Sequence, residues 1–118
     1  WCTPVMTFRR TAAEDCQIGS QPVRSGDKVL VSFTSANRDE AVFADPGRFD
    51  IRRQPNPHLV FGHGPHFCLG AHLARTQMRA LFAEVLARTS RLEAAGPPSY
   101  LRSNFQRGVK RLPLAWTA

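Results

Sequence analysis

Hydrophobic and polar positions form short β-type runs over the first third of this 118-residue chain. Residues 4–11 are extended in character, and residues 15–27 hold two short runs around a turn, which predicts a small hairpin. Residues 28–33 are mostly apolar and include two valines and a phenylalanine, which favour a strand. Ser35 and the acidic residues after it predict a short helix over residues 35–40.

No regular period is present over residues 43–66. Four prolines and several glycines interrupt this segment, and proline is poorly tolerated inside helices and central strands. Long segments without secondary structure usually carry a function in compact domains. We therefore expect an irregular meander with a functional role.

A helical period begins at Leu69, from which apolar side chains recur at spacings of three and four residues. This pattern predicts one long helix over residues 70–89. The Gly-Pro-Pro break at residues 96–98 separates it from an apolar tail, for which we expect a pair of strands with a turn near residues 106–108. We treat residues 1–118 as one portion with no internal boundary, and one hydrophobic core is the default expectation.

Composition and charge fit a folded, basic chain. Hydrophobic residues make up 42% and charged residues 21%, which does not suit a disordered chain. The formal net charge is +7, from 16 Lys and Arg against 9 Asp and Glu, and most of the cations are arginines. Because the arginines are scattered, they fit a solvated surface, an acidic partner or the carboxylates of a cofactor, and we expect no nucleic-acid partner.

Cysteine content and hydropathy indicate where the protein works. The three cysteines, at positions 2, 16 and 68, form no Cys-x-x-Cys pair, so neither a disulfide framework nor a zinc knuckle is indicated. A reducing cytoplasm fits this pattern best. No apolar run approaches the roughly 18 residues that a membrane span needs, and no leader-type segment opens the chain, so we expect a soluble protein with no membrane partner.

The segment with the most chemical information is residues 61–70, which read Phe-Gly-His-Gly-Pro-His-Phe-Cys-Leu-Gly. Its glycines, Gly62, Gly64 and Gly70, can take positive φ and allow a cofactor to approach the backbone closely. Cys68 stands where the amides of the following helix favour a thiolate. A buried structural thiol is the alternative. The glycine pattern favours the first interpretation, a thiolate ligand for a flat metal cofactor.

In the order Phe61-x-x-Gly64-x-His66-x-Cys68-x-Gly70, this segment resembles the haem-binding loop of the cytochrome P450 family. The resemblance covers essentially the whole chain and is to soluble bacterial members. Proteins of that family are much longer, so the resemblance implies a C-terminal fragment that lacks the N-terminal part of its parent chain. The implied fold is an α+β fragment of a mainly α haem-thiolate fold, with a β-hairpin and strands, an irregular meander, one long helix after the cysteine and a β tail.

The resemblance also implies roles for individual residues around haem b (iron protoporphyrin IX). Cys68 is implied to be the axial thiolate ligand of the iron, and Phe61 to pack beside the sulfur. His66 and Arg10 are implied to bind the two propionates, with Arg9 as the competing choice for Arg10. The full set of implied cofactor-binding residues is Phe61, Gly62, Gly64, His66, Cys68, Gly70 and Arg10.

Two walls of the family's substrate pocket fall on residues 4–7 and on the tail turn. The implied pocket residues are Val5, Met6, Phe105 and Gln106, and their mixture suits a small organic, apolar substrate. Ordinary packing is the alternative for each of them. Arg48 resembles a structural arginine of the family, whose Glu-x-x-Arg partners lie in a helix that precedes residue 1.

The activity that the resemblance implies is a monooxygenase reaction, an oxidoreductase activity that inserts one oxygen atom of O2 into the substrate. Electrons are expected from a ferredoxin-type or other acidic donor protein. His72, Arg75 and Arg79 are candidates for its basic docking face, and a solvated surface is the alternative. The family's oxygen-activating helix precedes residue 1, so we expect the chain alone to be inactive.

Two other functions stay open from the residues alone. His63, His66, Cys68 and His72 place four nitrogen and sulfur donors within ten residues, which allows a His/Cys metal-binding module. The basic charge allows a non-catalytic interaction domain.

Overall fold

The computed structural model describes residues 3–118, which divide into two compact units. The first unit holds the described residues up to Val60 together with Asn104–Gln106. The second unit holds Phe61–Ser103 and Arg107–Ala118. The units meet in the chain between Val60 and Phe61, so the cysteine segment opens the second unit.

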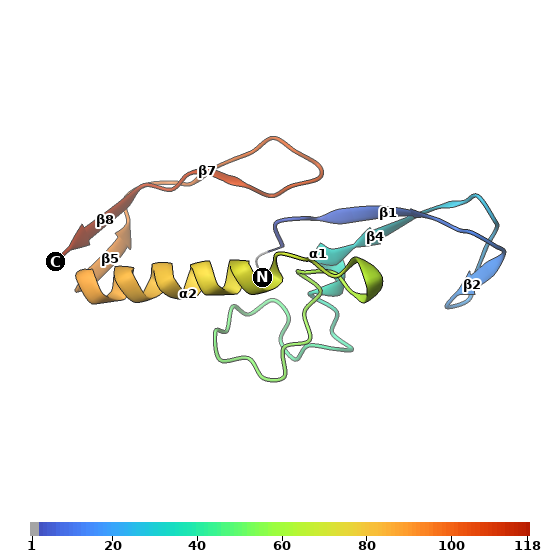
Figure 1. Ribbon diagram of the computed structural model, residues 1–118, viewed down its shortest axis with the longest axis horizontal. Helices are drawn as coiled ribbons and strands as arrows, with labels where there is room; N and C mark the ends of the chain where they lie inside the picture. The colour runs from blue at the N-terminus through green and yellow to red at the C-terminus, as the bar shows by residue number, and fades with distance from the viewer. Residues whose placement is uncertain (1–2) are drawn as a thin grey trace. The chain divides into compact units, whose positions relative to one another are not determined.

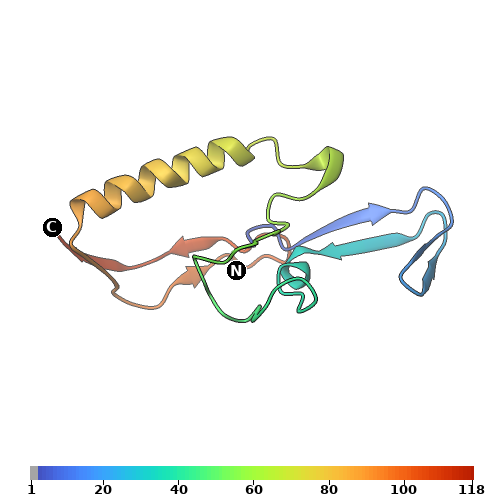
Figure 2. The ribbon, with the colours of Figure 1, turned by 90° about the horizontal axis from the view of Figure 1, so that it is seen from below.

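A two-stranded antiparallel ribbon is the main element of the first unit. Strand β1 (Thr7–Thr11) pairs with β4 (Lys28–Ser32), and the two run side by side in Figures 1 and 2. The register places Phe8 opposite Val31. Both strands were expected from the extended and β-branched runs, and they are confirmed.

The predicted hairpin follows β1 and is also confirmed. It consists of β2 (Cys16–Ile18) and β3 (Gln21–Val23), paired antiparallel around Gly19, which has φ +59°. Its base is closed by Asp15, whose Oδ1 accepts a hydrogen bond from the N–H of Ser25 at 2.7 Å.

The short helix α1 (Phe33–Ala36) differs from the prediction, which placed it over residues 35–40. Ser32 is its N-cap, because its side chain accepts a hydrogen bond from the N–H of Ser35 at 3.3 Å. Asp39 does not extend the helix. Its Oδ1 accepts from the N–H of Ala41 at 2.9 Å, which favours a turn.

As predicted, the meander has no long regular element and holds only one 3₁₀ turn, at Gly64–His66, and one side chain fixes its middle part. The Arg53 guanidinium donates to the carbonyl oxygens of Asp45 at 3.0 Å and Arg48 at 3.1 Å, and also to that of Ala44. Asp45 has φ +48°, in the left-handed region. Hydrogen bonds from one arginine thus replace the ladder bonds that a regular element would supply.

The second unit begins with a 3₁₀ turn, η1 (Gly64–His66), and continues into α2 (Ala71–Arg88). Helix α2 agrees closely with the predicted range of 70–89, and it ends where the N–H of Thr89 donates to the carbonyl of Val85 at 3.0 Å. Most of its apolar side chains are exposed. The single core that composition suggested is not formed among residues 3–118, where the buried hydrophobic residues are only Phe33, Phe43 and Ala71.

The tail forms two separate strand pairs. Strand β5 (Arg91–Ala94) pairs with β8 (Leu114–Thr117), and β6 (Ser99–Tyr100) pairs with β7 (Val109–Arg111), all antiparallel (Figure 2). The β6–β7 pair confirms the predicted strand pair, although its connection is longer than the turn expected near residues 106–108, and the β5–β8 pair was not predicted.

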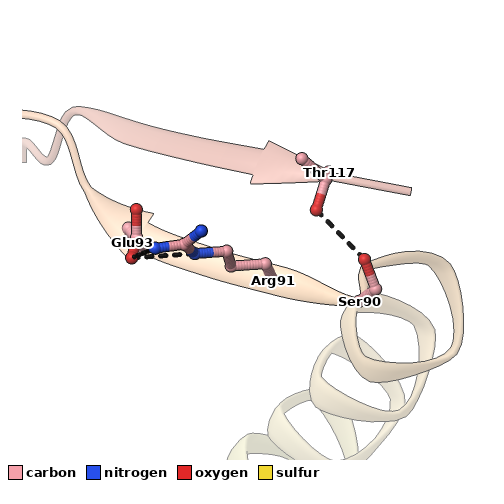
Figure 3. Close-up of polar contacts among 4 residues, drawn as sticks. All are labelled: Ser90, Arg91, Glu93 and Thr117. Atoms are coloured by element: carbon pink, nitrogen blue, oxygen red, sulfur yellow. Dashed lines mark hydrogen bonds and ion pairs between the residues drawn. The ribbon is translucent and has the colours of Figure 1, made fainter.

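Polar contacts close the β5–β8 end of the unit (Figure 3). Ser90 Oγ lies 3.0 Å from Thr117 Oγ1, and Arg91 pairs with Glu93 at 2.6 Å. These side chains are exposed, so their ion pair contributes little stability. Over residues 3–118, no helix has the length and apolar character required to cross a membrane.

Candidate functional site

The cysteine segment is folded back on itself by its own backbone. The N–H of Cys68 donates to the carbonyl of Phe61 at 2.8 Å, and the N–H of Phe67 donates to the carbonyl of Gly64 at 2.9 Å. The carbonyl of Cys68 accepts from the N–H of Ala71 at 3.2 Å. The loop therefore delivers its cysteine directly to the first turn of α2.

Two of the three framing glycines have the predicted backbone conformation. Gly62 has φ +76° and Gly64 has φ +71°, values that L side chains rarely adopt. Gly70 differs from the prediction, because its φ is −83°. A Cβ built at Gly70 stands 3.9 Å from Cys68 Sγ, an ordinary van der Waals contact, so this glycine lies directly beside the sulfur.

Cys68 is a free, exposed thiol in this structure. Its neighbours are also open, with Phe67 47% and Leu69 100% exposed. The Phe61 and Phe67 rings lie 6.3 Å apart. An accessible thiol between exposed apolar side chains fits a flat, apolar ring with a metal at its centre, because the ring would cover these side chains while the sulfur reaches the metal.

Arg75 contacts the cysteine loop, which sequence reasoning missed. Its guanidinium lies over the half-buried Phe61 ring at 4.7 Å from the centroid, a cation–π contact. Arg75 was assigned instead to a basic docking face with His72 and Arg79. The sequence spacing could have predicted this contact. Arg75 lies about one helical turn after Ala71, the first residue of the helix, and therefore stays near the loop.

The metal-binding alternative has no support from the structure. Over residues 3–118, no three side chains among His, Cys, Asp and Glu are grouped so as to hold a metal ion. His63, His66 and His72 are exposed, as is Cys68.

Arg10 lies in the first unit, on β1, and is exposed. Its guanidinium lies 5.4 Å from the centroid of the Phe8 ring and donates to the carbonyl of Arg9 at 3.2 Å. Because side chains alternate along a strand, Arg10 shares a face with Phe8, whereas Arg9 points to the other face. Arg9 and Arg10, which the sequence left as alternatives for one propionate, therefore point to opposite faces of β1. Binding of a propionate by either residue stays a prediction.

The four predicted pocket residues lie together in the first unit. Val5 forms an antiparallel bridge with Gln106, and the N–H of Met6 donates to the carbonyl of Phe105 at 3.0 Å. The carbonyl of Met6 in turn accepts from the N–H of Phe33 at 2.9 Å. The structure therefore joins two segments about 100 residues apart in the sequence, which were expected to supply two walls of the pocket, and their role in a pocket stays a prediction.

Two aromatic residues next to this wall were missed. The Phe8 ring lies edge-on to Phe33 with centroids 5.5 Å apart, and 6.0 Å from the Phe105 centroid. Phe33 is buried. No local pattern could have identified this cluster, since its members come from β1, α1 and the tail.

Arg48 is exposed, and its guanidinium forms no ion pair with any residue in the range 3–118. Its backbone is held instead: the N–H donates to the carbonyl of Asp45 at 2.9 Å, and the carbonyl accepts from Arg53. An ion pair with carboxylates elsewhere in a longer chain stays a prediction.

Comparison with known proteins gives consistent matches along the chain. The cytochrome P450 family model matches residues 2–103. Cytochrome P450-terp of a Pseudomonas species is 45% identical over 99% of this chain. The methyl-branched lipid omega-hydroxylase of Mycobacterium tuberculosis is 46% identical over 99% of it. The chain spans only 27% and 28% of the lengths of these two relatives.

A solved structure gives the same result in three dimensions. A cytochrome P450 of Mycobacterium marinum in complex with pseudoionone aligns with a TM-score of 0.92 and 50% identity. The alignment covers 97% of this chain and 28% of that protein. The fold described above is therefore found as one part of a larger, solved fold.

Proposed function

Because this chain belongs to the cytochrome P450 family, we propose that it is the haem-binding part of a haem-thiolate monooxygenase. The observation that carries the proposal is the exposed Cys68 at the start of α2, in a loop where Gly62 and Gly64 have positive φ. Haem held by a thiolate supplies the activation of O2, because the sulfur donates electron density to the iron and favours O–O cleavage. The oxidised substrate is an organic molecule that receives one oxygen atom.

The loop residues bind and orient the cofactor in this proposal. Cys68 Sγ ligates the iron of haem b, and Gly70 leaves the space beside the sulfur that a side chain would occupy. Phe61 packs next to the sulfur and excludes water, with the Arg75 guanidinium covering its ring. His66 and Arg10 bind the propionate carboxylates through charge-assisted hydrogen bonds.

The substrate is proposed to be apolar and to contact Val5, Met6, Phe105 and Gln106. The two backbone links between residues 5–6 and 105–106 hold these side chains in one wall. Two relatives support an apolar substrate: one is a methyl-branched lipid omega-hydroxylase, and the other was solved in complex with pseudoionone. Gln106 is the polar member of this set.

Electrons are proposed to arrive from a ferredoxin-type or other acidic protein. His72 and Arg79 are exposed on α2, the helix that directly follows the cysteine loop.

The place of action is proposed to be a reducing cytoplasm, because Cys16 and Cys68 are both free thiols.

The proposal is tested with the whole haem-loaded protein, an electron donor and a series of apolar substrates under ¹⁸O2. The expected product carries one ¹⁸O atom, derived from O2, and its formation depends on the reductant. A product labelled from H2¹⁸O instead, or turnover without reductant, would contradict the monooxygenase proposal.

A further inference from the structure

Asn37 is one of two buried polar residues among those the structure describes, 6% exposed, and the other is Thr3, 4% exposed. Asn37 follows α1 as its C-cap. A buried amide is destabilising unless its hydrogen-bonding groups have partners. The partners of Asn37 therefore show what the residue is for.

Three segments meet at this side chain. Its Oδ1 accepts a hydrogen bond from the N–H of Leu59 at 2.7 Å, and its Nδ2 donates to Thr3 Oγ1 at 3.4 Å. Its own N–H donates to the carbonyl of Phe33 at 3.0 Å, which fixes it to α1. The short Oδ1 contact is the stronger of the two side-chain bonds.

Leu59 lies at the exit of the meander, where no paired strand takes its N–H. It stands two residues before Phe61, whose carbonyl accepts the N–H of Cys68 at 2.8 Å. Val60, between them, is half-buried, and its N–H donates to Nδ1 of His58 at 3.4 Å. The bond from Asn37 thus fixes the backbone immediately before the base of the cysteine loop.

We propose that Asn37 is a positioning residue that anchors the entry of the cysteine loop through the Leu59 N–H. Its local role depends only on the hydrogen bonds given above. The effect of Asn37 on the cofactor rests on the proposed function. An anchored loop entry would restrict the position of the Phe61 carbonyl, and therefore of the Cys68 backbone that is hydrogen-bonded to it. The residue itself touches neither substrate nor cofactor.

The test compares three variants of the whole protein by hydrogen–deuterium exchange, resolved at the amides of residues 57–68. Asn37→Leu keeps the approximate size but leaves the Leu59 N–H without an acceptor, so that amide should exchange about 10- to 100-fold faster. Asn37→Asp keeps an acceptor oxygen that Thr3 can also donate to, and should restore exchange to within about threefold of the parent. Thr3→Val removes only the weaker bond and should leave Leu59 equally protected.

The Ser25 amide, held by Asp15 in the hairpin, serves as an internal control for general destabilisation. Equal acceleration of Ser25 and Leu59 in Asn37→Leu, or an equal effect of Thr3→Val on Leu59, would overturn the anchoring role. In the haem-loaded, reduced protein under CO, Asn37→Leu should lower the fraction with a thiolate-type Soret band, and Asn37→Asp should restore it.

The two proposals fail in different ways. If the parent protein never shows a thiolate-type band, the proposed function is wrong, while the exchange data still decide whether Asn37 anchors Leu59. If the parent shows the band and Asn37→Leu leaves both the band and the Leu59 exchange unchanged, the haem assignment stands and the anchor is wrong.

Discussion

Replacement of Gly64 by alanine isolates the backbone conformation of the cysteine loop. Gly64 has φ +71°, and a Cβ built there meets no atom within 4 Å. The destabilisation should therefore come from the left-handed conformation alone, about 1–2 kcal/mol for a residue with a Cβ. That free energy corresponds to a factor of about 5–30 in the equilibrium between closed and open loop.

Hydrogen exchange of the whole protein measures this equilibrium at the N–H groups of Phe67 and Cys68, which close the loop. Both should exchange about 5- to 30-fold faster in Gly64→Ala, and by a smaller factor in Gly64→Asn, because asparagine tolerates this region better. Gly47→Ala is the matched control, since Gly47 has equally open surroundings and no positive φ. Equal exchange in Gly64→Ala and Gly47→Ala would refute the reasoning.

Two further substitutions test contacts that support the site. Arg53→Lys should lower the free energy of unfolding by about 1–2 kcal/mol, because a single ammonium nitrogen does not reproduce the two-nitrogen fork that reaches the three carbonyls, whereas Arg52→Lys should change it by less than about 0.5 kcal/mol; similar urea-unfolding results for the two would contradict the role of Arg53. Arg75→Gln combined with Phe61→Leu in a double-mutant cycle should give a coupling free energy of about 0.5–1 kcal/mol, and additive effects would show that the cation–π contact contributes nothing.

Local patterns predicted those parts of the structure that local interactions determine. The apolar period gave α2 to within one residue at each end, and the glycine spacing gave the positive φ of Gly62 and Gly64. Such features depend on residues that are neighbours in the sequence. The prediction failed at the short helix, where Ser35 was expected as the N-cap and Ser32, at the end of β4, takes that place.

Hydrophobic periodicity in the sequence does not predict contacts between side chains of distant segments. The family resemblance implied only that Val5 and Gln106 line the same pocket, and neither their pairing nor the contacts of Phe8 with Phe33 and Phe105 were expected. Asn37 was seen only as part of a short segment, because nothing in the sequence shows which distant N–H a buried amide will meet. Side chains that join several segments are therefore the information that the structure adds.

The identity of the thiolate ligand is tested most directly by the reduced CO spectrum of the whole haem-loaded protein. The parent protein should show a Soret band shifted to the red, as thiolate ligation requires. Cys16→Ser should retain it, because Cys16 belongs to the β2 strand of the first unit and is not part of the cysteine loop. Cys68→Ser should lose it, and a red-shifted band that survives in Cys68→Ser would contradict the assignment of Cys68 as the haem ligand.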